Sequence, residues 1–148
     1  MRAVIQRVSY ASLKVDGKLI SEIKKGFLVF LGVGAGDSIE TSEKMAKKIA
    51  LLRVFEDEKG KINLSLADIS GEILLVSQFT LYADCKHGNR PSFTGAEKPE
   101  IAQKIYENFI NLLKSYGLPV KTGIFGADMK IELLNNGPVT IILDDKDL

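Results

Sequence analysis

The chain has 148 residues, of which 45% are hydrophobic and 26% are charged. This size and composition fit one compact domain with a sizeable core. Lys and Arg number 20 against 19 Asp and Glu, and the net charge of +1 excludes the global basic field of a strong nucleic-acid binder, while a local patch stays possible. The single cysteine, Cys85, excludes an intrachain disulfide and a multi-cysteine metal site, and it indicates a reducing compartment.

The first residues, Met1 to Arg7, carry charges at short intervals, which is unlike a signal peptide. No apolar run reaches the roughly 18–20 residues of a membrane span. We therefore expect a soluble, cytoplasmic protein in which residues 1–148 form one domain without a membrane partner.

The first third of the chain predicts strands followed by a helix. Residues 3–23 alternate in a way that indicates two or three strands, with Asp16-Gly17 as a tight hairpin turn. Phe27–Leu31 predicts a fully buried strand. Residues 40–53 carry apolar side chains at helical spacing with lysines outside. Three residues offer N-caps for that helix: Asp37, Ser38 and Thr41.

The rest of the chain predicts a second set of strands around a second helix. Asp57–Gly60 marks a hairpin, and Ile73–Val76 is a buried strand that runs into Ser77. Residues 85–98 form a polar loop. The second helix covers residues 100–116, and the last three strands cover residues 120–125, 130–134 and 139–143. Because hairpin signals outnumber strict strand–helix alternation, we expect an α+β fold, with a mostly antiparallel or mixed sheet forming a barrel-like core with two main helices.

Ser77-Gln78-Phe79-Thr80-Leu81 is not explained by local structure, because it places three polar side chains at the end of a buried strand. The simple explanation is that these side chains finish an edge strand and bond to the main chain. The functional explanation is that hydroxyls, a carboxamide and exposed amides converge on a ligand. Main-chain N–H groups at such a point can stabilise an oxyanion during acyl transfer. Thr80 is a candidate nucleophile, although no basic partner lies near it in sequence.

Asn135-Asn136-Gly137-Pro138-Val139-Thr140 is the second unexplained segment, since a Gly-Pro pair interrupts residues that favour a strand. The simple explanation is a β-turn. X-Pro bonds also reach the cis state far more readily than other peptide bonds. A cis bond at Pro138 would turn two carbonyls to one side. These rigid carbonyls could act as a chiral gauge, meaning an element that distinguishes the two enantiomers of a ligand.

Three other features have simpler explanations. Gly32–Gly36 has the spacing G-x-G-x-G rather than the G-x-G-x-x-G of dinucleotide-binding loops, so we expect a strand-to-helix connection. His87, the only histidine, cannot hold a metal alone, and we expect it in solvent rather than in a Ser-His-Asp site. Cys85 has only Lys86 as a weak activating neighbour. We expect no metal and no cofactor.

Two further stretches allow two explanations each. Arg90–Phe93 is either a turn that Phe93 anchors on the core or a loop that closes over a site lined by Phe93. A set of basic side chains forms either a solvated face or a surface for phosphate contacts. These side chains are Lys44, Lys47, Lys48, Arg53, Lys121 and Lys130.

Together, five segments resemble the bacterial D-aminoacyl-tRNA deacylase family over nearly the full chain. They are Ala3–Val8, Ser77–Leu81, Arg90–Phe93, Gly123–Met129 and Asn136–Thr140. Each segment alone is weak evidence for the resemblance, but the order and spacing of all five make the match specific. The resemblance implies hydrolysis of the ester between a D-amino acid and the 3′-terminal adenosine of tRNA, with glycyl-tRNA(Ala) as a further substrate.

The resemblance also implies a homodimer whose active sites lie at the subunit interface. The catalytic residues of one subunit, Ser77, Gln78, Phe79 and Thr80, would face the Gly137-Pro138 pair of the other. That pair is expected to be cis, to exclude L side chains and to admit D-amino acids and glycine. Further residues expected to bind substrate are Phe93, Leu81 and Met129.

An aminoacyl ester is already activated, so positioning, oxyanion stabilisation and a water suffice for hydrolysis. We expect the main-chain amides of Phe79 and Thr80 to hold the oxyanion and the substrate's own 2′-hydroxyl to activate the water. Thr80 as a covalent nucleophile is the competing mechanism. Two other functions remain open: a non-catalytic dimer that binds tRNA or a nucleotide, and a purely structural dimer.

Overall fold

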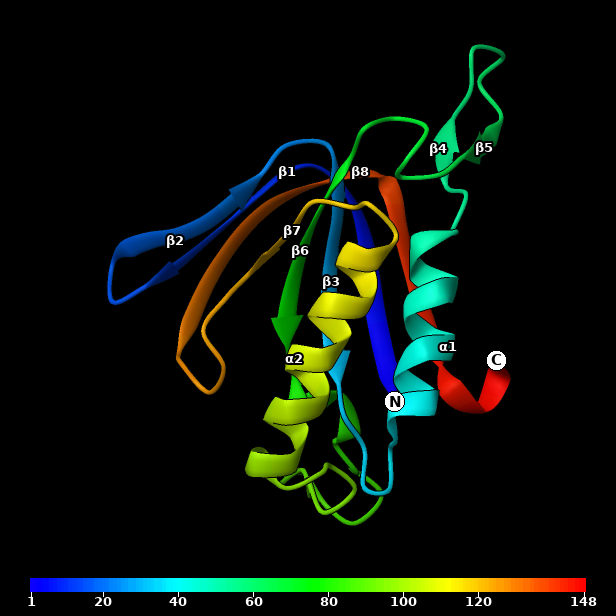
Figure 1. Ribbon diagram of the computed structural model, residues 1–148. Helices are drawn as coiled ribbons and strands as arrows, with labels where there is room; N and C mark the ends of the chain where they lie inside the picture. Colours follow the sequence, from blue (N-terminus) through cyan, green and yellow to red (C-terminus); the bar gives the residue numbers. More distant parts are fainter.

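The computed structural model describes residues 1–148 and contains a mixed six-stranded sheet with two helices (Figure 1). The strands of this sheet are β1 (Arg2–Val15), β2 (Lys18–Ile23), β3 (Gly26–Gly32), β6 (Glu72–Ser77), β7 (Val120–Thr122) and β8 (Met129–Asp144). Their order is β2-β1-β3-β6-β7, and β8 pairs with β1. A separate hairpin, β4 (Phe55–Glu56) with β5 (Ile62–Leu64), projects from one end of the molecule. The predicted α+β class with a mixed sheet is confirmed.

The long strand β1 organises the sheet. Its first half pairs with β3, its second half pairs with β2, and β8 runs along both halves; all three pairings are antiparallel. The predicted turn at Asp16-Gly17 is confirmed, with φ angles of 49° and 75°. The pairs β3–β6 and β6–β7 are parallel, so the sheet is mixed rather than purely antiparallel.

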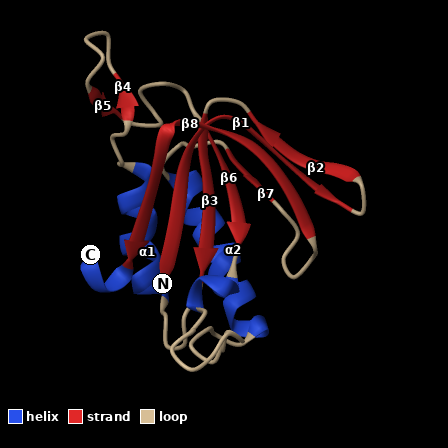
Figure 2. Ribbon diagram, turned by 180° about the vertical axis from the view of Figure 1, so that it is seen from behind, coloured by secondary structure: helices blue, strands red, loops and turns tan.

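Both helices cover the same face of the sheet (Figure 2). Helix α1 (Ile39–Ala50) begins after Ser38, whose side chain accepts from the Thr41 amide in a capping box. Helix α2 (Pro99–Ser115) begins with proline and ends before Gly117, where φ is 76°. The predicted helices are therefore confirmed to within three residues at each end. No helix is both long and apolar enough to span a membrane.

Two hydrophobic clusters lie within the fold. The larger one joins both helices to β1, β3 and β6. The smaller one joins the second half of β1 to β2, β3, β6 and the start of β8. There the sheet curls toward a barrel, because the Ser21 hydroxyl on β2 donates to the Thr122 carbonyl on β7 at 2.6 Å.

The prediction of two separate strands over residues 130–134 and 139–143 is wrong, because β8 is one continuous strand. Thr140 pairs with Gln6 and Asn135 pairs with Val8, so four residues of β8 lie opposite Arg7 alone. This bulge accommodates the Gly-Pro pair. A proline is tolerated there because β8 is an edge strand with one free side.

A further correction concerns β6 and β7. The simple explanation of the polar segment placed it on an edge strand, but β6 lies between β3 and β7. Strand β7 ends at Thr122, earlier than the predicted Phe125. The early end of β7 leaves the last part of β6 without a neighbour on that side.

Candidate functional site

The polar segment Ser77–Thr80 lies where the sheet opens. Strand β7 pairs with β6 only as far as Leu75, whereas β3 still pairs with Ser77. The Gln78 amide adds one more bond to the Leu31 carbonyl at 2.8 Å. The chain then turns into a short 3-10 helix, Phe79–Tyr82. The segment is therefore fixed on its β3 side and open on the other.

A cavity of about 680 Å³ lies against this open side. Five of the predicted site residues line it: Ser77, Gln78, Phe79, Phe93 and Met129. Thr80, Leu81, Gly137 and Pro138 do not line it. The other walls come from α2, which contributes Ala102 and Tyr106, and from the segment after β7, which contributes Phe125. A volume of this size is in the range of small-molecule sites.

The main-chain amides of Phe79 and Thr80 begin the 3-10 helix. The first N–H groups of a helix have no partner within it, and Gln78 at the N-cap position makes no side-chain cap. The Gln78 carboxamide instead donates to Thr80 Oγ1 at 2.5 Å. The arrangement offers unpaired N–H donors at an exposed turn, and the group that faces the Thr80 hydroxyl is a neutral carboxamide rather than a base.

Two aromatic rings lie at the cavity. Phe79 and Phe93 pack edge to face with 5.1 Å between ring centroids, and both rings are exposed. The loop that carries Phe93 is closed by main-chain bonds between Asp84 and Ser92 and is attached to the β3–α1 connection by the Ala35–Gly95 bond of 3.0 Å. Of the two explanations for Arg90–Phe93, the geometry favours the one in which Phe93 lines a site.

Gly137 and Pro138 are both exposed and lie at the bulge of β8. The peptide bond between them is cis, and Gly137 has φ of 137°. The guanidinium of Arg7 donates to the Asn136 carbonyl at 2.9 Å, and the Val139 amide donates to the Asn135 side chain at 2.9 Å. The exposed pair is thus held by bonds on both of its sides.

The two segments that were expected to meet in the active site, Ser77–Thr80 and Gly137-Pro138, lie far apart within one chain. Ser77 pairs with Leu31, which pairs with Ala3, whereas Gly137 lies opposite Arg7. Four residues along β1 correspond to roughly 13 Å, and three strand spacings from β8 to β6 add roughly 14 Å across the sheet. One chain therefore does not bring the Gly-Pro pair to Ser77–Thr80.

The chain matches known proteins along nearly its whole length. A family model described as D-Tyr-tRNA(Tyr) deacylase matches residues 4–144. The chain belongs to this family. A D-aminoacyl-tRNA deacylase of Thermosipho africanus is 56% identical over 99% of this chain and 98% of the relative. One of Aquifex aeolicus is 55% identical over the whole of both chains.

Two solved structures share the fold of this chain. The structure of a "c-Myc DNA Unwinding Element Binding Protein" superposes with a TM-score of 0.91 at 44% identity, covering 97% of this chain and 98% of the other. A probable eukaryotic D-amino acid tRNA deacylase superposes with a TM-score of 0.80 at 17% identity, covering 96% and 97%. The second likeness shows the fold alone.

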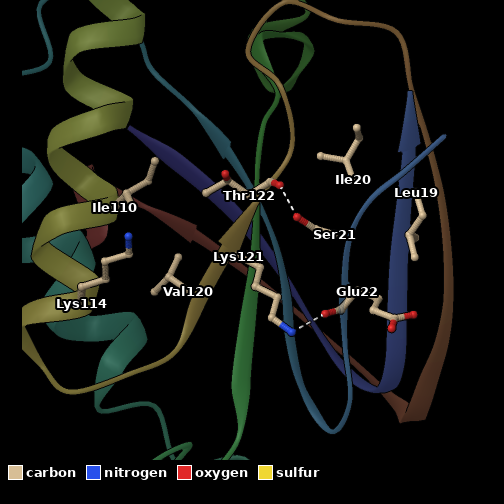
Figure 3. A pocket seen from close by; sticks show the side chains of 9 residues that line it. All are labelled: Leu19, Ile20, Ser21, Glu22, Ile110, Lys114, Val120, Lys121 and Thr122. Atoms are coloured by element: carbon tan, nitrogen blue, oxygen red, sulfur yellow. Dashed lines mark hydrogen bonds between the residues drawn. The ribbon is translucent and has the colours of Figure 1, made fainter. Parts of the chain in front are cut away.

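The predicted basic face is partly neutralised in this deacylase-family chain. Lys44 pairs with Glu40 at 2.9 Å, and Lys130 pairs with Asp128 at 2.9 Å. Lys121 pairs with Glu72 at 3.1 Å and lines a second groove of about 590 Å³ between β2, β7 and α2 (Figure 3). None of the predicted site residues lines that groove. His87 and Cys85 are exposed, as expected for the former.

Sequence reasoning missed three side chains that hold the site. Arg7 was noticed only as part of the opening segment, and its position within a strand rich in buried residues was the signal of a buried charge. Tyr106 was hidden in an amphipathic helix. Arg2 carried no sequence signal, because its partners are 79 and 142 residues away in the chain.

Proposed function

We propose that this protein hydrolyses the ester between a D-amino acid and the 3′-terminal adenosine of tRNA. Membership in the deacylase family supports a hydrolase acting on aminoacyl-tRNA esters. The observation that carries the proposal is the turn at Phe79–Thr80, which offers unpaired amides beside a cavity lined by Ser77 and Gln78. We extend the substrates to glycyl-tRNA(Ala), because glycine has no side chain for a chiral gauge to reject.

In the proposed reaction the amides of Phe79 and Thr80 bind the oxyanion that forms when water attacks the ester carbonyl. Preorganised N–H donors of this kind supply a large part of catalysis in acyl transfer. The substrate's 2′-hydroxyl activates the water. The contact between the Gln78 carboxamide and Thr80 Oγ1 argues against the competing mechanism, since a nucleophilic hydroxyl needs an acceptor for its proton.

Selectivity is assigned to Gly137-Pro138 of a second subunit. The pair is exposed on an edge strand whose outer side has no partner. The same strand exposes Leu134 by 53% and Ile142 by 73%, which suits burial against a second copy. In the homodimer the rigid carbonyls of the pair would penalise an L side chain, and such penalties give selectivity that attraction alone does not. Leu81 and Met129 would complete the walls.

A non-catalytic nucleic-acid-binding dimer is the second candidate. It is favoured by one observation: the structural relative at 44% identity is named as a protein that binds a DNA unwinding element. The net charge of +1 and the ion pairs on the lysines weigh against it. It also gives no role to the exposed Gly-Pro pair.

One assay separates the two functions. D-tyrosyl-tRNA, L-tyrosyl-tRNA and glycyl-tRNA(Ala) are incubated with the protein, and the release of free amino acid is followed. We expect release from the D-ester and the glycyl ester but not from the L-ester. Binding of tRNA without any release would support the second function, and equal release from both tyrosyl esters would overturn the role given to Gly137-Pro138.

A further inference from the structure

The segment that carries the two catalytic amides has few attachments of its own. On one side it bonds to β3 through Gln78. On the other side β7 has already left the sheet, and the side chains of Phe79 and Thr80 are exposed. An exposed turn at an open sheet edge is expected to be mobile unless other groups hold it. Two side chains from distant elements hold this one.

Tyr106 holds the strand before the segment. Its hydroxyl donates to the Leu75 carbonyl at 2.8 Å, at the last residue that β7 pairs. The side chain is 4% exposed and lines the cavity. Its ring also packs against Phe125, which lines the same cavity, at 5.9 Å between ring centroids. Burial raises the pKa of the Tyr106 hydroxyl, which therefore stays protonated as a donor.

Arg2 holds the turn after the segment. Its Nη1 donates to the Leu81 carbonyl at 3.1 Å, and its guanidinium lies 4.7 Å from the centroid of the Tyr82 ring. Its Nε donates to Asp144 at the end of β8 at 2.8 Å. The planar, fork-shaped guanidinium is what allows these contacts to be made together. The end of the 3-10 helix is thereby tied to β8.

We propose that Tyr106 and Arg2 are positioning residues for ester hydrolysis, which fix the two ends of the segment Leu75–Tyr82 and so aim the Phe79 and Thr80 amides into the cavity. The proposal rests on the function proposed above. Neither side chain needs to touch the substrate. Each acts because an oxyanion site works only when its donors are already in place before the reaction, and small misplacements are costly.

The test compares Tyr106→Phe and Arg2→Lys with two controls. Tyr116→Phe removes a hydroxyl from an exposed tyrosine just after the same helix. Ile49→Val removes one methyl group from the fully buried core and lowers thermal stability away from the cavity. For Tyr106→Phe we expect kcat for D-tyrosyl-tRNA to fall roughly 10- to 100-fold while KM stays within about twofold. We expect a smaller fall for Arg2→Lys and none for either control.

Amide hydrogen exchange without substrate gives a readout that does not depend on the reaction. We expect the amides of Gln78, Leu81 and Ala83, which are hydrogen-bonded to Leu31, Gln78 and Thr80, to exchange faster in both variants than in the wild type and in Ile49→Val. Faster exchange with an inactive wild type would support the positioning role and overturn the proposed function. A loss of kcat no larger than that of Ile49→Val, or unchanged exchange at these three amides, would overturn the positioning role.

Discussion

The Arg7 guanidinium donates through Nε to the main-chain carbonyl of Asn136 at 2.9 Å, immediately before Gly137. Its Nη1 donates to the Val54 carbonyl at 2.6 Å, and only 5% of the residue is exposed. Arg7 therefore joins the bulge of β8 to the base of the β4–β5 hairpin. A buried charge with two carbonyl partners is held in one orientation, and the Gly-Pro wall is held with it.

Replacement of this arginine by lysine should damage selectivity more than the fold. The lysine keeps the charge but presents a single ammonium, which does not reproduce the fork that reaches both Asn136 and Val54. For Arg7→Lys we expect the ratio of D- to L-tyrosyl-tRNA hydrolysis to fall about tenfold or more, corresponding to about 1.4 kcal/mol. Parallel rate measurements on the two esters give this ratio.

Glu56→Gln is the matched control for the arginine variant. Glu56 lies 3.8 Å from Nη2 of Arg7, and its side chain is 60% exposed. The contact is long and the carboxylate lies largely in solvent, so we expect the Glu56 charge to contribute little and this variant to keep the wild-type ratio. An unchanged ratio in Arg7→Lys as well would remove Arg7 from the support of the Gly-Pro wall.

Gly137→Ala should disturb the same wall directly. Gly137 has φ of 137°, which a residue with a side chain rarely adopts. An added Cβ would lie 2.9 Å from Nη2 of Arg7 and 2.9 Å from Cγ2 of Val139. We expect the variant to fold but to lose D-ester hydrolysis or D-over-L preference, as measured with both tyrosyl esters. Wild-type preference together with wild-type rate would place the chiral gauge elsewhere.

Thr80→Ala should keep most of the activity. The proposed chemistry uses the main-chain amide of Thr80 and not its hydroxyl, and the hydroxyl contacts the Gln78 carboxamide. We expect kcat within about fivefold of the wild type, far from the loss of roughly 10⁴-fold or more that follows removal of a covalent nucleophile. A fall to the uncatalysed rate, with an acyl-enzyme trapped on the wild type, would instead assign Thr80 as the nucleophile.

Elements with strong local signals were predicted well from the sequence. The turn at Asp16-Gly17 and the capped helix after Ser38 depend on residues close in the chain, and both are confirmed. The extent of β8 was not predicted, because the Gly-Pro pair is a strong local signal of interruption. Pairing with β1 on both sides of the bulge overrides that signal.

The candidate site was predicted only in part, for a similar reason. The sequence pointed to Ser77 and Gln78, which line the cavity, because polar groups at the end of a buried strand are unusual. Tyr106 and Arg2, which we propose hold this segment, form hydrogen bonds to partners that lie 31 and 79 residues away in the sequence. Helical periodicity places Tyr106 only on the apolar face of a helix. The hydrogen bond from its hydroxyl to the Leu75 carbonyl is seen only in the three-dimensional structure.

The contacts of Glu72, the first residue of β6, predict that the stability of the fold depends on pH. Its carboxylate accepts from the Lys24 amide at 2.8 Å and pairs with Lys121 at 3.1 Å. The amide bond from Lys24, followed by Lys121, lowers the pKa of Glu72 from its ordinary value of 4.5. A lowered pKa stabilises the folded state above the ordinary value, and that contribution is lost as the pH falls through the lowered pKa.

We therefore expect Glu72→Gln to lower the melting temperature at pH 7 and to have a progressively smaller effect as the pH falls below 4.5 and the wild-type carboxylate becomes protonated. Thermal unfolding of both proteins at several pH values measures the difference between them. Asp128→Asn is the control, because that carboxylate pairs with Lys130 on a surface where both side chains are more than three-quarters exposed. A difference between wild type and Glu72→Gln that stays constant from pH 7 to pH 3 would show that the side chain contributes through packing and not through its charge.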